Sequence, residues 1–327
     1  MPQPHHDVIV IGAGISGLVC AYRLKSLGVD VALLERSDRV GGVIQSERID
    51  GFLIERGPNS SQGGEELLAL VEELEMTAEL IEANPKAPAY VYFNGRLHPV
   101  PSSPAAFLKS GLLSLGGKLR ILKEPFVPAR QSGAEESVAS FARRRIGQEP
   151  AERLVAPFVA GIYAGDADQL SVQAAFPRLA SLESGYGSLF RGMFAKARQA
   201  RRAKRAAAGS AVANAVPARK RLCSFRSGMS HLPRMLAAKL GEDLLTACSE
   251  LRISDCSLRS ETGAQPARFL IEFERSGNHH QLGCDQIVIA TPANIASSMA
   301  ASFSDQLSRL LQEIEYPPLS ILSIAYD

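Results

Sequence analysis

A glycine-rich turn between an apolar run and a helix-like pattern constrains this sequence more than any other feature. Residues 7–11 (DVIVI) are typical of a buried parallel strand, and the turn GAGISG follows at 12–17. Gly28 ends the next segment, and 30–35 (DVALLE) predicts a second strand. Between them, apolar residues recur at the spacing of one helix face: Ile15, Leu18, Val19 and Tyr22. This unit predicts an α/β fold with a Rossmann-type sheet and a right-handed crossover.

The spacing of the glycines predicts dinucleotide binding. Gly12 permits a tight turn, Gly14 lets the backbone approach a pyrophosphate, and Gly17 lets the helix pack on the strand. The helix N-terminus offers free N–H groups to phosphates, and Glu35, at the end of the second strand, can bind ribose hydroxyls. The alternative is a turn that only packs. The expected contacts are Gly12, Ala13, Gly14, Ile15, Ser16, Gly17 and Glu35.

A second glycine loop, R-x-G-G at 39–42, follows directly after Glu35. It can run along a pyrophosphate, which a plain nicotinamide domain does not require; a simple turn is the alternative. Together with E-R at 35–36 and E-R-G-P-N-S at 55–60, it resembles the amine-oxidase branch of the glutathione-reductase-like flavoproteins. The resemblance implies FAD as cofactor. Its further expected contacts are Arg36, Arg39, Gly41, Gly42, Val43, Gly57, Pro58, Asn59 and Ser60.

The segment 158–179 (FVAGIYAGDADQLSVQAAFPRL) resembles the signature of the protoporphyrinogen oxidase family: a G-[VI]-[YF]-A-G-[DN] loop, L-S and A-F-P. The hairpin at 90–100, GYGSLFRG at 185–192, the segment 224–241 and VIATPA at 288–293 are similar to other parts of that family. The resemblance implies that Gly161, Tyr163 and Gly165 contact substrate and that Leu251 lies on an adenine-contacting strand. Packing is the alternative role for Tyr163.

The resemblance implies oxidation of a porphyrinogen by hydride transfer from a meso carbon to a flavin, in successive two-electron steps. It implies no catalytic side chain; the Gly161 carbonyl could accept a pyrrole N–H. Protoporphyrinogen IX is the expected substrate and coproporphyrinogen III the rival, with oxygen or another acceptor reoxidising the flavin. The chain could instead be an amine oxidase or carotenoid desaturase of the same superfamily, an inactive remnant, or one piece of a split protein.

The sequence departs from the family pattern in two places. Ala89 stands where members often have a base just before the hairpin tyrosine, and Lys86 is the nearest base. Family chains also continue beyond the point that corresponds to Asp327, with more substrate-lining strands and a last glycine-rich flavin-binding segment. We therefore expect an apolar strand at 319–326 with an unpaired edge, poor solubility or association, weak FAD binding and no oxidation.

The expected organisation is an FAD-binding domain made from 1–84 and 223–302, interrupted at 85–222, with 303–327 beginning a segment that returns to the substrate domain. The substrate sheet is thus interleaved with the FAD domain. The interruption holds the hairpin, which turns at Asn94-Gly95, and a mostly helical domain that ends in a basic segment at 195–222. Helices are expected over 65–80 and 105–195, including one begun by a capping box at Ser132 and Glu135.

Composition excludes several classes. The 36 Lys and Arg nearly balance the 34 Asp and Glu, which does not favour nucleic-acid binding. The five cysteines are scattered, which predicts buried thiols in a reducing compartment, and no metal site is expected. No apolar run is long enough to span a bilayer, and the start does not resemble a secretory signal. We expect a cytoplasmic protein, with peripheral membrane contact through 107–122 or 195–222 as the alternative; the oligomeric state stays open.

Overall fold

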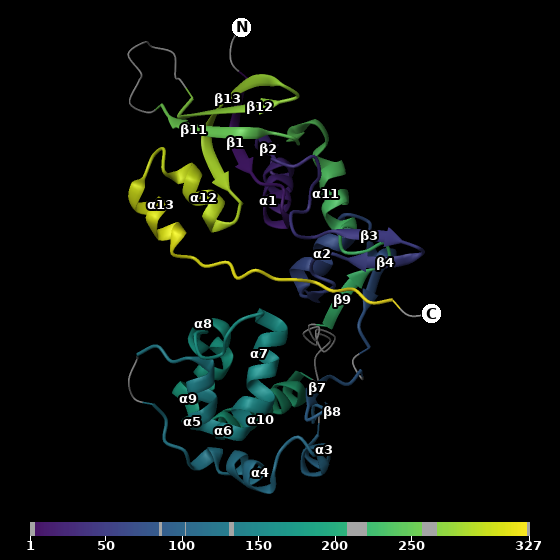
Figure 1. Ribbon diagram of the computed structural model, residues 1–327, viewed down its shortest axis with the longest axis vertical. Helices are drawn as coiled ribbons and strands as arrows, with labels where there is room; N and C mark the ends of the chain where they lie inside the picture. Colours follow the sequence, from purple (N-terminus) through teal and green to yellow (C-terminus); the bar gives the residue numbers. More distant parts are fainter. Residues whose placement is uncertain are drawn as a thin grey trace. The chain divides into compact units, whose positions relative to one another are not determined.

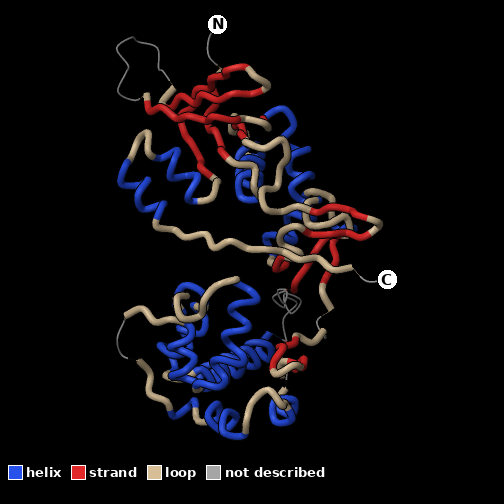
Figure 2. Tube along the Cα trace, in the orientation of Figure 1, coloured by secondary structure: helices blue, strands red, loops and turns tan. Residues whose placement is uncertain are grey.

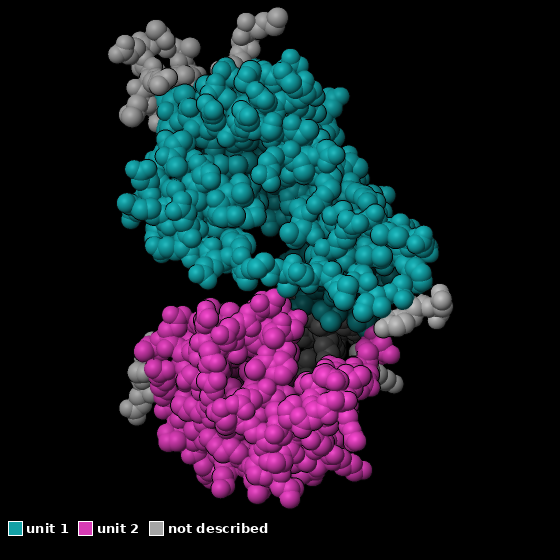
Figure 3. Space-filling model, in the orientation of Figure 1, with its two compact units in different colours: residues 1–83, 219–327 teal, residues 84–218 magenta. Residues whose placement is uncertain are grey.

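The computed structural model describes residues 4–84, 87–101, 103–130, 134–207, 221–256 and 267–325. The chain divides into two compact units, coloured separately in Figure 3. Residues 1–83 and 219–327 form the first, here called the sheet unit, and residues 84–218 form the second, the helical unit. Figure 2 shows that most strands belong to the sheet unit and that helices dominate the other. The helical unit therefore interrupts the sheet unit in the chain between residues 83 and 219.

The sheet unit contains most of the strands and five α-helices of the described chain. Its strands are β1 His5–Ile11, β2 Val31–Leu34, β3 Ser46–Ile49, β4 Phe52–Glu55, β5 Ser61–Gly63, β6 Leu80–Glu82, β9 Arg221–Phe225, β10 Leu244–Leu245, β11 Ser249–Asp255, β12 Phe269–Arg275 and β13 Asn278–Ile289. Its helices are α1 Ile15–Ser26, α2 Glu65–Glu73, α11 His231–Leu240, α12 Ala293–Ala300 and α13 Asp305–Gln312, with 3-10 turns η1 Thr77–Glu79 and η4 Gly241–Asp243.

The helical unit begins with the hairpin β7 Tyr90–Phe93 and β8 Arg96–Pro99. Its helices are α3 Pro104–Lys109, α4 Leu115–Leu122, α5 Val138–Ile146, α6 Gln148–Pro150, α7 Ala156–Tyr163, α8 Val172–Ala175, α9 Pro177–Tyr186 and α10 Leu189–Ala207. A 3-10 turn, η2, spans Glu124–Phe126, and a π-helical turn, η3, spans Ala151–Val155. Positive φ angles at Asn94 (49°) and Gly95 (75°) form the tight hairpin turn that this residue pair predicts.

The main sheet has the strand order β10-β2-β1-β13-β12-β11. Strands β10, β2, β1 and β13 are parallel, and β12 and β11 continue the sheet in antiparallel pairing. In β1, Val8 lies opposite Gln286 and Ile11 opposite Ile289. The prediction that 7–11 and 286–290 share one sheet is therefore confirmed, and so is the Rossmann-type α/β class.

Two apolar clusters cover the faces of this sheet. One contains alternate residues of β1 and β2, such as Val10 and Leu33, packed against α1, α2 and α11. The other contains the intervening residues, such as Ile9 and Leu34, together with side chains of β11 and β12. In Figure 1, α1 and α11 lie beside the purple strands β1 and β2. Successive side chains of a strand point to opposite faces of the sheet, so the apolar runs in β1 and β2 place apolar side chains on both faces. Both faces must therefore be packed against other apolar groups.

Several local expectations were wrong. The helix that begins at Glu65 ends at Glu73, and η1 follows, rather than continuing to residue 80. Helix α5 is capped by Ser137, whose hydroxyl accepts from the Ser140 amide; Ser132 lies outside the described residues. The basic segment is helical to Ala207, residues 208–220 lie outside the described part, and β9 already begins at Arg221.

The expected strand at 319–326 is also wrong for its described residues. Residues 319–325 have no regular secondary structure and are exposed, and residue 326 lies outside the described part of the chain. Figure 1 shows this segment as an extended yellow trace after α13. An apolar run adopts a strand only where a neighbouring edge supplies hydrogen bonds, and 319–325 has no strand partner among the described residues.

Candidate functional site

The glycine turn leaves an open space at the N-terminus of α1. Gly14 is the N-cap of α1, and the first turn has neither a capping side chain nor an acidic residue. The free N–H groups of this turn therefore form a positive helix end that no side chain neutralises. A Cβ placed on Gly14 would meet no atom within 4 Å, whereas one on Gly17 would overlap the carbonyl oxygen of Gly12. The three glycines thus have distinct roles, with Gly12 at φ +102° making the turn.

The second glycine loop lies against the first. The Gly41 amide donates to the Ala13 carbonyl at 2.8 Å, and Gly41 forms a parallel bridge with Gly14. A Cβ on Gly42 would lie 3.3 Å from the Gly14 Cα, and Gly42 has a φ of +58°. Two loops about 28 positions apart in the chain therefore border one small space, which fits the prediction that both meet a pyrophosphate.

The loop from Gly57 to Ser60 joins the same region through its first residue. A Cβ on Gly57 would overlap the Val43 carbonyl oxygen, so the two backbones touch directly. Val43 itself is exposed, and so are Pro58 and Asn59. The Ser60 hydroxyl donates to the Asn59 side-chain oxygen at 3.0 Å. These residues present an accessible surface beside the R-x-G-G loop.

Glu35 is fixed at the carboxyl end of β2. Its Oε2 accepts from the Ala13 amide at 2.7 Å, and its Oε1 accepts from the Ser37 amide at 2.9 Å and the Ser37 hydroxyl at 2.7 Å. A carboxylate has about four acceptor positions, so capacity for a ribose hydroxyl remains. Arg36 and Arg39 are exposed and form no ion pair within the described ranges. Both are therefore available to a phosphate.

Sequence reasoning missed the segment that lies beside Glu35. The Glu35 amide donates to the Leu245 carbonyl at 2.8 Å, the Cys248 amide donates to the Glu35 carbonyl at 2.9 Å, and the Ala247 amide donates to the Ser37 carbonyl at 2.8 Å. Leu251, the residue expected at the adenine, lies farther along in β11 and packs on the second apolar cluster. The short strand β10, only two residues long, gave no usable periodicity.

Thr291 is a second missed residue. It follows β13, and its methyl group lies 3.0 Å from the position that a Cβ on Gly12 would occupy. Its hydroxyl is buried and has no hydrogen-bond partner within the described part of the chain. Buried hydroxyls normally have a partner, so an unpaired one beside the glycine turn fits a polar ligand there.

The helical unit contains an apolar cavity of about 640 Å³ that is partly open to solvent. Its walls come from the hairpin, α3, α5, the helical run η3–α7, and α8–α9. The aromatic residues that line it are Tyr90, Phe107, Phe141, Phe158 and Phe176. Arg145 is the one charged residue among the described residues that line it. A large apolar cavity with few polar groups is typical of a site for a bulky apolar ligand.

The residues of segment 158–179 that were expected to contact substrate, here called the family-like segment, lie in different places. Gly161 lines the apolar cavity, and it lies in the last turn of α7 rather than in a loop. Tyr163 does not line it: its hydroxyl donates to the Ala175 carbonyl at 3.0 Å, and its ring meets Phe176 edge-on at 5.5 Å. Gly165 lines a separate hollow of about 220 Å³ beside Arg143. Ala89 lines the apolar cavity, and Lys86 lies outside the described residues.

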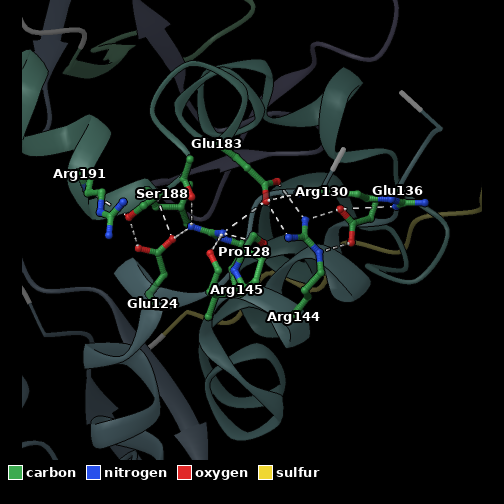
Figure 4. Close-up of polar contacts among 12 residues, drawn as sticks. Glu124, Pro128, Arg130, Glu136, Arg144, Arg145, Glu183, Ser188 and Arg191 are labelled. Carbon is green, nitrogen blue, oxygen red and sulfur yellow. Dashed lines mark hydrogen bonds and ion pairs between the residues drawn. The ribbon is translucent and has the colours of Figure 1, made fainter. Parts of the chain in front are cut away.

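A network of charged side chains joins several elements of the helical unit (Figure 4). Arg145 is fully buried and pairs with Glu124, which is also fully buried, and with Glu183. Arg144 bridges Glu183, at 2.6 Å, and Glu136, at 2.7 Å. These pairs connect η2, α5 and α9, and α5 and α9 both contribute residues to the cavity.

The surroundings of Glu124 keep it ionised. Burial acts to raise the pKa of its carboxyl, but hydrogen bonds from the Ser188 hydroxyl, the Leu189 and Phe190 amides and Arg145 outweigh burial and lower the pKa below its usual value. The pKa of Glu183 is lowered as well, with burial again opposed, here mainly by Arg144. Both carboxylates therefore remain charged partners of the arginines at neutral pH.

Comparison with known proteins identifies the family. The sequence profile of flavin containing amine oxidoreductases matches residues 15–327. The chain belongs to the flavin-containing amine oxidoreductase family. The cofactor of this family is a flavin, in agreement with the FAD predicted from the glycine loops.

Two relatives and one solved structure show where the similarity lies. The chain is 33% identical over 325 residues to protoporphyrinogen oxidase 1, chloroplastic, of Arabidopsis thaliana, covering 98% of this chain and 59% of that protein. It is 38% identical over 208 residues to coproporphyrinogen III oxidase of Bacillus subtilis (strain 168), covering 59% of this chain and 44% of the relative. A putative protoporphyrinogen oxidase from Exiguobacterium sp. 255-15 shares the fold, with a TM-score of 0.68 at 24% identity, covering 92% of this chain and 62% of that one.

The chain spans about three fifths of the length of the first of these relatives.

The family resemblance inferred from 158–179 is confirmed, because both relatives are named for porphyrinogen oxidation. Among the described residues, no helix has the length and apolar character needed to cross a membrane.

Proposed function

We propose that the protein oxidises a porphyrinogen to the corresponding porphyrin with FAD as its cofactor, and that protoporphyrinogen IX is its substrate. The apolar cavity of about 640 Å³, lined by Gly161 of the family-like segment, is the observation that supports this best. Its volume falls in the range of pockets that enclose a cofactor-sized ligand, and its aromatic walls suit a macrocycle. The 33% identity to a protoporphyrinogen oxidase over 98% of the chain supports the same substrate class.

The reaction needs binding and exclusion of water more than acid–base chemistry. Going from porphyrinogen to porphyrin removes four meso C–H and two pyrrole N–H hydrogens, which equals three hydrides and three protons, so hydrogens must also shift between meso carbon and pyrrole nitrogen and the protons pass to solvent. A bound flavin would supply the hydride acceptor. Gly161 lies in the last turn of α7, where carbonyls lack helical partners, so its carbonyl oxygen is available to a pyrrole N–H. No side chain is assigned as an acid or base. Oxygen or another acceptor then takes the electrons.

We propose that the diphosphate of FAD lies between the two glycine loops, at Gly12–Gly17 and Arg39–Gly42. Glu35 would bind the adenosine ribose, and Arg36, Val43 and the 57–60 loop would contact the rest of the cofactor. The open space at Gly14 and the uncompensated N-terminus of α1 support this position. Leu251 stays a proposed contact on the adenine side.

Coproporphyrinogen III is the second candidate substrate, because the 38% identity to the Bacillus subtilis enzyme is higher, though over 208 residues only. The two macrocycles differ in the number of their propionate groups. Initial rates with each porphyrinogen, followed by the fluorescence of the porphyrin product, decide between them. A preference for coproporphyrinogen III of tenfold or more in kcat/KM, equivalent to about 1.4 kcal/mol, would overturn the assignment of protoporphyrinogen IX.

The test of the cavity is Gly161→Leu, compared with Gly185→Leu. Both glycines are exposed helical residues, and a Cβ at either would meet no atom within 4 Å, but only Gly161 lines the cavity. We expect Gly161→Leu to lose whatever porphyrin formation the unmodified protein shows, with flavin content and circular dichroism unchanged, and Gly185→Leu to retain it. Normal turnover by Gly161→Leu would place the substrate elsewhere.

We also propose peripheral contact with a membrane through α3, α4 and η2. Large apolar side chains of this segment are exposed, including Leu115 at 79% and Phe126 at 81%, and Lys109, Lys118 and Lys123 lie among them. Phe107 of the same segment lines the cavity, so an apolar substrate could pass from lipid along it. Vesicle flotation should show binding that Leu115→Glu with Phe126→Glu removes; Leu27→Glu, which changes an exposed leucine of the sheet unit, should not affect it.

A further inference from the structure

Helix α10 carries positive charge that no carboxylate of the described chain neutralises. From residue 196 to residue 202 every residue of the helix is exposed. The basic side chains of this stretch have no hydrogen-bond or ion-pair partner among the described residues: Lys196, Arg198, Arg201 and Arg202. The sequence contains no Asp or Glu at 184–241 except outside that range, so no local acid can pair with them. Since arginine keeps its charge throughout the physiological pH range, α10 is a permanent cationic surface.

The arginines of α5, in the same unit, are used differently. Arg143 pairs with Asp168 at 2.6 Å, and Arg144 pairs with Glu183 at 2.6 Å. The helical unit thus supplies carboxylate partners where arginines hold its elements together. The unpaired arginines of α10 join no elements, so the stability of the fold does not explain them.

The packing of α10 directs its charges to the outside of the helical unit. Gly192 lies against α9, because a Cβ placed on it would be 2.7 Å from Cδ2 of Leu182. Phe194, Arg198 and Arg201 occupy the side of the helix away from that contact, since an α-helix has about 3.6 residues per turn. The helix therefore packs through its glycine and presents a basic face that includes one aromatic ring.

Exposed apolar side chains accompany these charges. Phe194 is 75% exposed and Met193 is 45% exposed. The first turn of α10 is bonded to η2, where the Leu189 amide donates to Oε1 of Glu124 at 2.8 Å, and Phe126 of η2 is 81% exposed. Solvation would account for the arginines but not for large apolar side chains exposed beside them. A membrane surface offers anionic headgroups and an apolar boundary together, and so accounts for both.

We propose that α10 binds the headgroups of anionic phospholipids, with Arg198, Arg201 and Arg202 at the phosphates and Phe194 at the boundary of the acyl chains. Charge complementarity selects this partner, because an anionic membrane attracts basic residues that lie close to its surface. The inference rests on the proposed function, since α10 would act beside the membrane contact proposed for α3, α4 and η2. It adds the class of lipid that the helical unit prefers.

The test measures flotation of the full 327-residue protein with phosphatidylcholine vesicles and with vesicles that also contain phosphatidylglycerol. Each basic residue at an anionic surface contributes about fivefold in affinity, so three arginines predict a preference of about a hundredfold for the anionic vesicles. The combined variant Arg198→Gln, Arg201→Gln and Arg202→Gln should lose this preference and bind neutral vesicles as before. Glutamine has nearly the helix propensity of arginine, so circular dichroism should not change. Salt at about 1 M should also remove the preference of the unmodified protein, because it screens charges beyond about 3 Å.

The matched control combines Arg48→Gln, Arg252→Gln and Arg309→Gln, which removes the same charge from exposed positions of the sheet unit. Its preference for anionic vesicles should persist. Equal binding of both vesicles by the unmodified protein, or an equal loss of preference in the two combined variants, overturns the role of α10 alone. Binding to a single-stranded RNA in place of anionic vesicles, lost in the α10 variant, overturns it in favour of nucleic acid. Failure to bind either vesicle overturns the proposed membrane contact with it.

Discussion

The sheet unit and the helical unit bury different kinds of side chain. Of the described residues, the four buried charged ones all lie in the helical unit: Glu124, Glu136, Arg145 and Glu183. The polar residues buried in the sheet unit are serines, namely Ser230, Ser297 and Ser308. The sheet unit forms its candidate cofactor site from glycine backbone, and the helical unit surrounds its cavity with apolar side chains held by ion pairs.

This difference determines which changes each unit tolerates. A backbone site depends on the absence of Cβ atoms, so it fails when a side chain is added. A buried ionic network depends on every partner being present, so it fails when a side chain is removed. The two units should therefore respond to opposite kinds of substitution.

The largest effect is expected at the glycine turn. Gly14→Val would place a side chain in the open space that we assign to the pyrophosphate, at a φ of −64° that valine adopts without strain. We expect flavin binding to be abolished while circular dichroism stays that of the unmodified chain. Gly17→Val would overlap the Gly12 carbonyl and should unfold the sheet unit. Stoichiometric flavin in purified Gly14→Val would contradict the assignment of the site.

The next effect is expected in the helical unit. Glu124→Ala leaves Arg145 buried without its main partner, which should lower the free energy of unfolding by about 3–5 kcal/mol. Glu73→Ala, which removes an exposed partner of Arg23 in the sheet unit, should leave it nearly unchanged. Urea denaturation measures both, and hydrogen exchange should locate the loss in α5 and α9. Equal, small effects of the two substitutions would show that the network contributes little.

Acid should destabilise the helical unit before the sheet unit. The folded-state pKa values of Glu124, Glu136 and Glu183 lie below the ordinary value of 4.5, so their contribution to stability is complete above that pH. This contribution to stability is lost as the pH falls from 4.5 through the lower folded-state pKa values, because the unfolded chain then binds more protons than the folded chain. Hydrogen exchange between about pH 5 and about pH 2.5 should show α5 and α9 opening before β1 and β13. Opening of the main sheet first would contradict this order.

The sequence predicted the glycine site because local spacing determines it. Gly12, Gly14 and Gly17 lie within six residues of one another, and the residues at 8–11 and 31–34 beside them are apolar, so both the fold class and the main sheet could be predicted. The R-x-G-G loop was predicted as part of the same site because it lies close in the chain to Glu35, and its contact with a pyrophosphate stays a prediction.

The parts that escaped prediction depend on distant contacts. The pairing of Arg145 with Glu124 joins residues 21 positions apart, and that of Arg144 with Glu183 joins residues 39 apart, with no period to indicate either. Arg143, Arg144 and Arg145 looked alike as the basic last turn of one helix, yet one is exposed and one is fully buried. The segment 319–325 fitted a strand pattern, but periodicity cannot show whether a partner edge exists.

The smallest effects are expected at Thr291, where one substitution should raise the melting temperature and lower the affinity for FAD. Its buried hydroxyl has no partner among the described residues, so Thr291→Val replaces an unsatisfied polar group with a methyl group of similar size. Without flavin, the melting temperature should rise by a few degrees, since about 1 kcal/mol of desolvation is relieved. FAD affinity should fall by about tenfold if the hydroxyl binds the cofactor beside Gly12. Thr77→Val, in an exposed 3-10 turn of the same unit, should change neither quantity. A higher melting temperature with unchanged FAD affinity would leave Thr291 a packing residue, and the polar contact at the glycine turn would then come from backbone alone.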